Sequence, residues 1–124
     1  YCRFLSEEFG RFAARLKGTP EPEGDGNMLD HTVLLFGSAS SAFHLSRNYP
    51  LSLAGGKRLG FRHGQYLNNA KDPAGGAWRG GIEPWRKEVT QEEVPLSNVF
   101  LTMLRRLGVE AEHFVGSTEA YENV

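Results

Sequence analysis

Two short apolar runs separated by a polar loop stand out in the middle of the chain. Residues 32–37 and residues 50–54 are rich in β-forming side chains and lack strict alternation of apolar and polar positions. This pattern is typical of strands that are covered on both faces, as in the sheet of an α/β protein. Gly55 and Gly56 follow the second run and predict a tight turn. We therefore expect two neighbouring strands in one sheet.

The segment before these runs has the apolar spacing of a helix. Residues 3–17 place apolar side chains at steps of four, three and four positions: Leu5, Phe9, Phe12 and Leu16. Gly18 suits the end of this helix. Gly10 weakens it by roughly 1 kcal/mol relative to alanine, which predicts that another part of the chain packs closely there.

A second helix is predicted over residues 96–107 by the apolar stripe Val99, Phe100, Met103, Leu104 and Leu107. Gly108 is its expected end, and the polar tail beyond it carries Phe114, which we expect to dock back onto the fold. Between the strands and this helix, residues 59–67 predict a short edge strand, with His63 partly exposed on it. Both helices are expected to cover the sheet.

Composition adds limits to this picture. The chain has 124 residues and a net charge of −1, so it can form one α/β domain, and nothing in its charge favours nucleic acid or an anionic membrane. The long Gly/Trp-rich loop at about 68–94 and a helix starting beside Tyr1 indicate a C-terminal fragment of a larger domain. Such a fragment is expected to self-associate or to contact the missing upstream part of its own chain.

The loop after the first strand holds the best candidates for a binding site. It leaves the carboxyl end of the strand, where α/β sheets bind ligands, and carries His44, Arg47 and Asn48. A hydrogen bond from His44 to a backbone carbonyl explains that residue equally well. Metal sites need three or four ligands, so we expect no metal and no cofactor, and an anion if this loop binds anything. We expect Asp30, beside His31, to bond local backbone N–H groups.

Aromatic side chains form a second candidate surface. Trp78 and Trp85 in the long loop, with Tyr66, could bind a carbohydrate or a peptide. The alternative is that the two tryptophans seal the edge of the core.

The order of these pieces resembles the C-terminal part of an uncharacterised bacterial family placed in the alkaline-phosphatase/sulfatase-like superfamily. The resemblance rests on an Asp-His-Thr strand start, the stretch FHLSRNYPLSLAGG and the stretch PLSNVFLTMLRRLGVEAEHF. It implies a fragment of an alkaline-phosphatase-like sheet with flanking helices. It also implies an exported protein.

The departures from that family's pattern concern its metal ligands. Where the resemblance places an Asp-His pair after the first strand, this chain has Ser38 and Ala39, and Asn98 stands where an Asp leads the last helix. The nucleophile would lie upstream of this chain. We therefore expect a non-catalytic or degenerate C-terminal module. The alternatives are the C-terminal half of a metal-dependent phosphate- or sulfate-ester hydrolase, and a carbohydrate- or peptide-binding surface.

Overall fold

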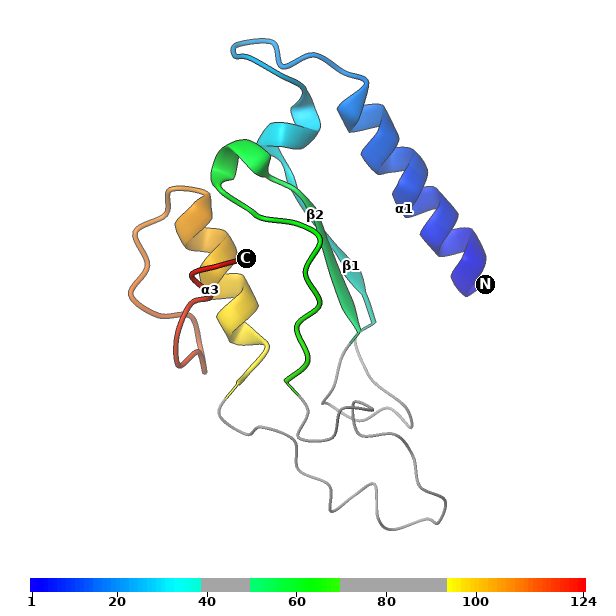
Figure 1. Cartoon of the computed structure of the whole chain (residues 1–124). Coiled ribbons are helices and arrows are strands. Elements are labelled where there is room, and N and C mark those ends of the chain that lie inside the picture. Colours follow the sequence, from blue (N-terminus) through cyan, green and yellow to red (C-terminus); the bar gives the residue numbers. More distant parts are fainter. Residues whose placement is uncertain (39–49, 70–93) are drawn as a thin grey trace.

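The computed structural model of the chain describes residues 1–38, 50–69 and 94–124. These ranges hold two α-helices and two strands: α1 (Cys2–Lys17), β1 (Val33–Gly37), β2 (Leu51–Gly55) and α3 (Ser97–Arg106). Short 3-10 helices occur at Met28–His31 and Lys57–Leu59. The two α-helices lie on opposite sides of the strand pair (Figure 1). The fold is thus a small mixed α/β arrangement, which confirms the predicted class.

The two predicted strands are neighbours and run antiparallel. Val33 lies opposite Gly55, and Gly37 lies opposite Leu51. Leu34 is buried, whereas the other residues of the two strands are half-buried or exposed. The expectation of strands covered on both faces is therefore wrong. Two strands with one helix against them leave much of their surface uncovered.

Helix α1 follows the predicted apolar spacing and contacts the sheet through an aromatic pair. The ring of Phe9 stacks on the ring of Phe36 in β1, with centroids 4.8 Å apart and planes at 20°. Gly18 caps the helix and its N–H donates to the carbonyl of Ala14, as expected for a C-terminal stop. The close approach predicted at Gly10 is wrong: this residue is exposed, and a Cβ added there would meet no atom within 4 Å.

The turn after β2 is as tight as the paired glycines predict. Gly55 and Gly56 both adopt left-handed backbone conformations, with φ of 77° and 70°. The N–H of Gly56 donates to the carbonyl of Leu29 at 2.9 Å. A Cβ on Gly55 would collide with the carbonyl of Thr32, so the backbone of this turn lies directly against the start of β1.

The edge strand predicted over 59–67 is wrong. Leu59 ends the second 3-10 helix, and residues 61–69 are irregular. Gly60 and Gly64 adopt φ of 88° and 83°, and these left-handed turns are incompatible with an extended strand. Phe61, immediately after Gly60, is buried, so the segment is anchored by one aromatic side chain rather than by a strand partner.

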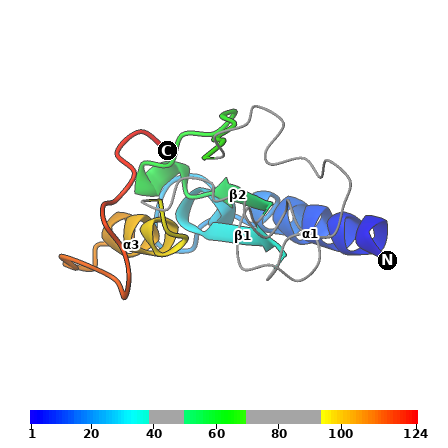
Figure 2. The same ribbon diagram turned by 90° about the horizontal axis from the view of Figure 1, so that it is seen from below.

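Helix α3 and the chain after it form the second half of the fold. The helix spans nearly the predicted range and buries Leu101, which is 1% exposed. The C-terminal segment returns to α3 (Figures 1 and 2), and Phe114 packs against Phe100 with ring centroids 5.6 Å apart. The predicted docking of Phe114 is confirmed. Within the described ranges, neither helix is long and apolar enough to span a bilayer.

Candidate functional site

Five of the six candidate site residues predicted from the sequence lie outside the described part of the chain: His44, Arg47, Asn48, Trp78 and Trp85. Tyr66 is described, and 84% of its surface is exposed. Its neighbours anchor the segment to the tail: Gln65 Nε2 donates to the carbonyl of Asn123 at 2.7 Å, and Asn69 Nδ2 donates to the hydroxyl of Tyr121 at 3.1 Å. Tyr66 is thus presented at the surface between two fixed points.

Asp30 has the local role that the sequence predicts. Its carboxylate accepts the N–H of Asn27 at 3.3 Å, while Asn27 Oδ1 accepts the N–H of Asp30 at 3.2 Å. This reciprocal pair is a capping box that starts the first 3-10 helix. His31 Nε2 lies 3.1 Å from the carbonyl oxygen of Asp25. Both side chains therefore fix the turn that leads into β1.

His63 is exposed, as expected, although the strand predicted around it does not form. Its Nε2 donates to the carbonyl of Gly55 at 2.5 Å, which ties the irregular segment to the end of β2. His113 is exposed in the tail. Across residues 1–38, 50–69 and 94–124, no three His, Cys, Asp or Glu side chains lie close enough together to hold a metal ion.

The most elaborate polar arrangement joins α3 to the tail. Asn98 is fully buried, with 0% of its surface exposed. Its Oδ1 accepts the N–H groups of Thr118 and Glu119 at 2.9 and 3.4 Å, and its Nδ2 donates to Thr118 Oγ1 at 3.1 Å. The amide of Asn98 therefore serves as the inner anchor of the C-terminal segment.

One turn later, Thr102 continues this connection. Its hydroxyl donates to the carbonyl of Asn98 at 2.7 Å and accepts the N–H of Tyr121 at 2.8 Å. Thr102 is 3% exposed, so the hydrogen bond to Tyr121 is formed away from water. A buried hydroxyl that both donates and accepts leaves no unpaired polar atom at this point.

Two arginines at the end of α3 bind the outer part of the tail. Arg105 donates to the carbonyls of Ala111 and Glu112, both at 2.9 Å. Arg106 donates to the carbonyl of Glu122 at 2.8 Å. Two cations in the last turn also suit the negative end of the helix dipole. Asn98 and Thr102 lie four positions apart on the side of α3 that faces away from the predicted apolar stripe, so the sequence pattern contained no signal that the tail covers this side.

Helix α1 carries a group of exposed apolar side chains. None of its residues is buried. Phe4 and Phe12 are 58% and 52% exposed, Leu5 is 37% exposed, and Tyr1 at its start is almost fully exposed. Phe4 and Leu5 lie three and four positions after Tyr1, and Phe12 lies seven positions after Leu5, so these residues share one side of the helix. That side lies beside the Phe9 contact with the sheet.

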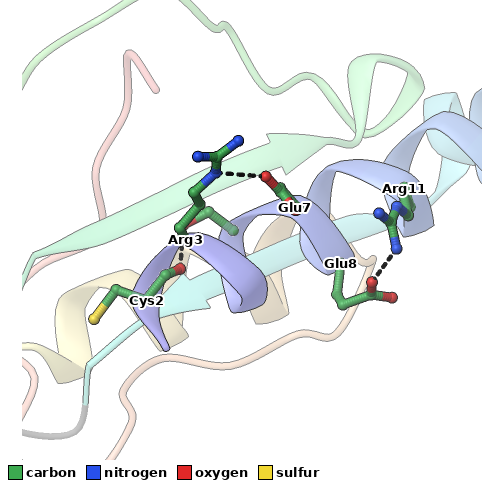
Figure 3. A network of polar contacts seen from close by, with 6 residues as sticks. Cys2, Arg3, Glu7, Glu8 and Arg11 are labelled. Carbon is green, nitrogen blue, oxygen red and sulfur yellow. Dashed lines mark hydrogen bonds and ion pairs between the residues drawn. The ribbon is translucent and has the colours of Figure 1, made fainter.

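Two ion pairs lie along the same helix, on different sides of it (Figure 3). Arg3 Nε donates to Glu7 Oε1 at 2.8 Å, and Arg11 pairs with Glu8. Glu8 lies four residues after Phe4 and four before Phe12, so the Glu8–Arg11 pair belongs to the apolar side. We refer to Tyr1, Phe4, Leu5, Glu8, Arg11 and Phe12 together as the α1 surface.

Comparisons of the chain with protein-family models, curated proteins and solved structures find no match.

Proposed function

We propose that this chain is a non-catalytic C-terminal module of an alkaline-phosphatase-like protein, and that it acts by binding another polypeptide through the α1 surface. The observation that carries the proposal is the exposure of Phe4 and Phe12 on a helix that buries no residue. Rings of this size are among the strongest contributors to protein interfaces. Grouped on one side of a helix, they are typical of a surface that another protein covers.

The size of the core supports the same role. The apolar residues buried among those described are Leu34, Phe61 and Leu101. So few buried apolar side chains within residues 1–38, 50–69 and 94–124 contribute little to the free energy of folding, because hydrophobic stabilisation scales with the apolar area removed from water. Covering the α1 surface would add to that area.

The described polar residues support a non-catalytic role, because their hydrogen bonds hold the chain together. Asp30 caps a 3-10 helix, and His63 binds the carbonyl of Gly55. Asn98 stands where the resemblance places a carboxylate, and its amide is occupied by the backbone of Thr118 and Glu119. These groups position backbone rather than substrate.

An esterase assay tests the non-catalytic part of this proposal. The purified chain, supplied in turn with zinc, manganese and calcium, is expected to release no product from an aryl phosphate or an aryl sulfate above the buffer rate. The His44→Ala variant should behave identically. Metal-dependent turnover that His44→Ala abolishes would contradict the proposal and favour the hydrolase alternative. The coding sequence upstream of Tyr1 is a second test, since a Ser/Thr nucleophile followed by paired Asp residues would also favour an enzyme.

The exposure of Tyr66 favours a second candidate function, a surface for a carbohydrate or a peptide. An exposed aromatic ring held by anchored neighbours provides a flat apolar face for stacking. Glycan-array binding that weakens in Tyr66→Ala, and that is lost in the combined Trp78→Ala and Trp85→Ala variant, would support this function. An array without signal would argue against the carbohydrate ligand.

A further inference from the structure

We infer that the polypeptide bound by the α1 surface is α1 of a second copy of this chain, packed antiparallel about a two-fold axis at Glu8. This inference rests on the proposed function, because it names the partner of the same surface. It adds the partner, the direction of the helices and the register.

The register follows from the spacing of the exposed rings. Phe4 and Phe12 lie four residues before and four residues after Glu8. When two such helices run antiparallel with Glu8 at the two-fold axis, Phe4 lies opposite the partner's Phe12. Phe12 then lies opposite the partner's Phe4, so one surface complements itself, as a two-fold symmetric dimer requires. Both rings, each more than half exposed in the single chain, would be covered by this arrangement.

The charges on α1 fit the same register. Two Glu8 carboxylates near the axis would repel each other if they stood alone. Each is paired with Arg11 of its own helix, so the centre of the dimer carries two negative and two positive charges. Antiparallel packing brings Arg11 close to the partner's Glu8, because Arg11 lies one turn from the axis. Charge therefore favours this pairing, and the net charge of −1 for the whole chain adds little repulsion.

The length of α1 sets the expected strength of the dimer contact. A helix of 16 residues is about 24 Å long. A single pair of such helices falls at the small end of specific interfaces, below about 1,200 Å² of total buried surface, where association is weak. We therefore expect a dimer whose population rises with protein concentration.

Sedimentation and light scattering across a wide concentration range test the inference. The wild-type chain should move from monomer to dimer as its concentration rises. The Phe4→Ser and Phe12→Ser double variant should stay monomeric at every concentration, with unchanged helix content by circular dichroism. The control is Val115→Ser, which removes an apolar side chain that is 87% exposed in the tail and should leave dimerisation intact. A wild-type chain that stays monomeric, or a dimer that survives the double substitution, would overturn the inference.

Disulfide trapping tests the register without relying on loss of association. Cys2 is the free, exposed cysteine of α1 and is first replaced in Cys2→Ser. In that background, Glu8→Cys places two thiols near the two-fold axis, where mild oxidation should give a covalent dimer. The matched control is Gly10→Cys, two residues after Glu8 and therefore on the opposite side of α1, and it should not cross-link. Cross-linking through Gly10→Cys in place of Glu8→Cys would overturn the register.

The two proposals can fail separately. A monomeric chain without esterase activity removes the second copy as the partner and leaves the non-catalytic module standing. Metal-dependent esterase activity in a chain that dimerises through α1 removes the non-catalytic role and leaves the dimer.

Discussion

The side-chain amide of Asn98 forms hydrogen bonds with both the backbone and the side chain of Thr118. Its Oδ1 accepts the N–H of Thr118 at 2.9 Å, and its Nδ2 donates to the hydroxyl of the same residue at 3.1 Å. The tail therefore folds onto α3 without forming a strand or a helix of its own. Because Asn98 is fully buried, these bonds are shielded from competition with water.

We predict that Asn98→Ala lowers the free energy of unfolding by roughly 1–3 kcal/mol, since it leaves the N–H of Thr118 without this acceptor. Urea denaturation should show a lower midpoint with a similar slope. The control is Asn123→Ala, an exposed position that contributes a backbone carbonyl to Gln65. A midpoint for Asn98→Ala equal to that of the control would contradict the anchoring role.

Thr102→Val should destabilise the fold by a similar amount, roughly 1–3 kcal/mol, because valine keeps the shape of threonine and removes the acceptor of the Tyr121 N–H. Amide hydrogen exchange at Tyr121 should become faster in this variant. Thr102→Ser keeps the hydroxyl and serves as the control, with exchange at Tyr121 close to the wild-type rate. Unchanged exchange in Thr102→Val would show that the hydroxyl does not hold the tail.

Gly55→Ala and Gly64→Ala separate backbone strain from steric overlap. Both glycines have positive φ, at 77° and 83°, which costs an alanine roughly 1–2 kcal/mol. A Cβ at Gly64 would meet no atom within 4 Å, whereas one at Gly55 would strike the carbonyl of Thr32. Thermal unfolding should therefore show an additional loss of about 1–3 kcal/mol for Gly55→Ala. Equal losses would mean that the turn can move away from β1.

Gly10→Ala should stabilise the chain. The position is exposed in the middle of α1, and the added methyl group would meet nothing. Alanine favours a helix over glycine by about 0.8–1.0 kcal/mol. The melting temperature should rise and the helical circular-dichroism signal should strengthen. A lower melting temperature would indicate that a partner packs against Gly10, on the side of α1 opposite the proposed dimer contact.

The chain is predicted to bind no catalytic metal. Catalytic zinc sites use three protein ligands and a water, and the sequence offers one histidine, His44, in the loop after the first strand. Calorimetric titration with zinc, manganese and calcium should show no tight stoichiometric binding. A sub-micromolar site that is lost in His44→Ala would contradict this expectation.

The elements whose structure depends on a local pattern were predicted correctly from the sequence. The apolar spacing of residues 3–17 and 96–107 gives α1 and α3, because a helix side is set by residues within one turn of each other. Gly55 and Gly56 give the turn after β2, since this backbone conformation is one that glycine adopts readily. The capping of Asp30 is local in the same sense, as its partner Asn27 lies three residues away.

The predictions from the sequence are wrong where the structure depends on contacts between residues far apart in the chain. Residues 59–67 have a strand-like composition, but Gly60 and Gly64 turn the backbone, and Gln65 bonds to Asn123 instead of to a strand. Gly10 was expected to lie against another part of the chain, but it is exposed, with no atom within 4 Å of a Cβ added there. Whether a glycine accommodates a neighbour is decided by that neighbour's position, which the local sequence does not contain.

Local sequence patterns therefore account for the helices and the glycine turn, because each follows from interactions between near neighbours. The apolar runs also located the two strands, although their pairing joins distant residues such as Val33 and Gly55. The role of Asn98 and the exposed side of α1 depend instead on contacts between distant parts of the chain. Asn98 lies outside the predicted apolar stripe of α3, and it is buried where Thr118, 20 residues further on, folds against it. Phe12 belongs to the same predicted apolar stripe as Phe9, and the position of Phe36 in β1 selects which of the two rings is covered.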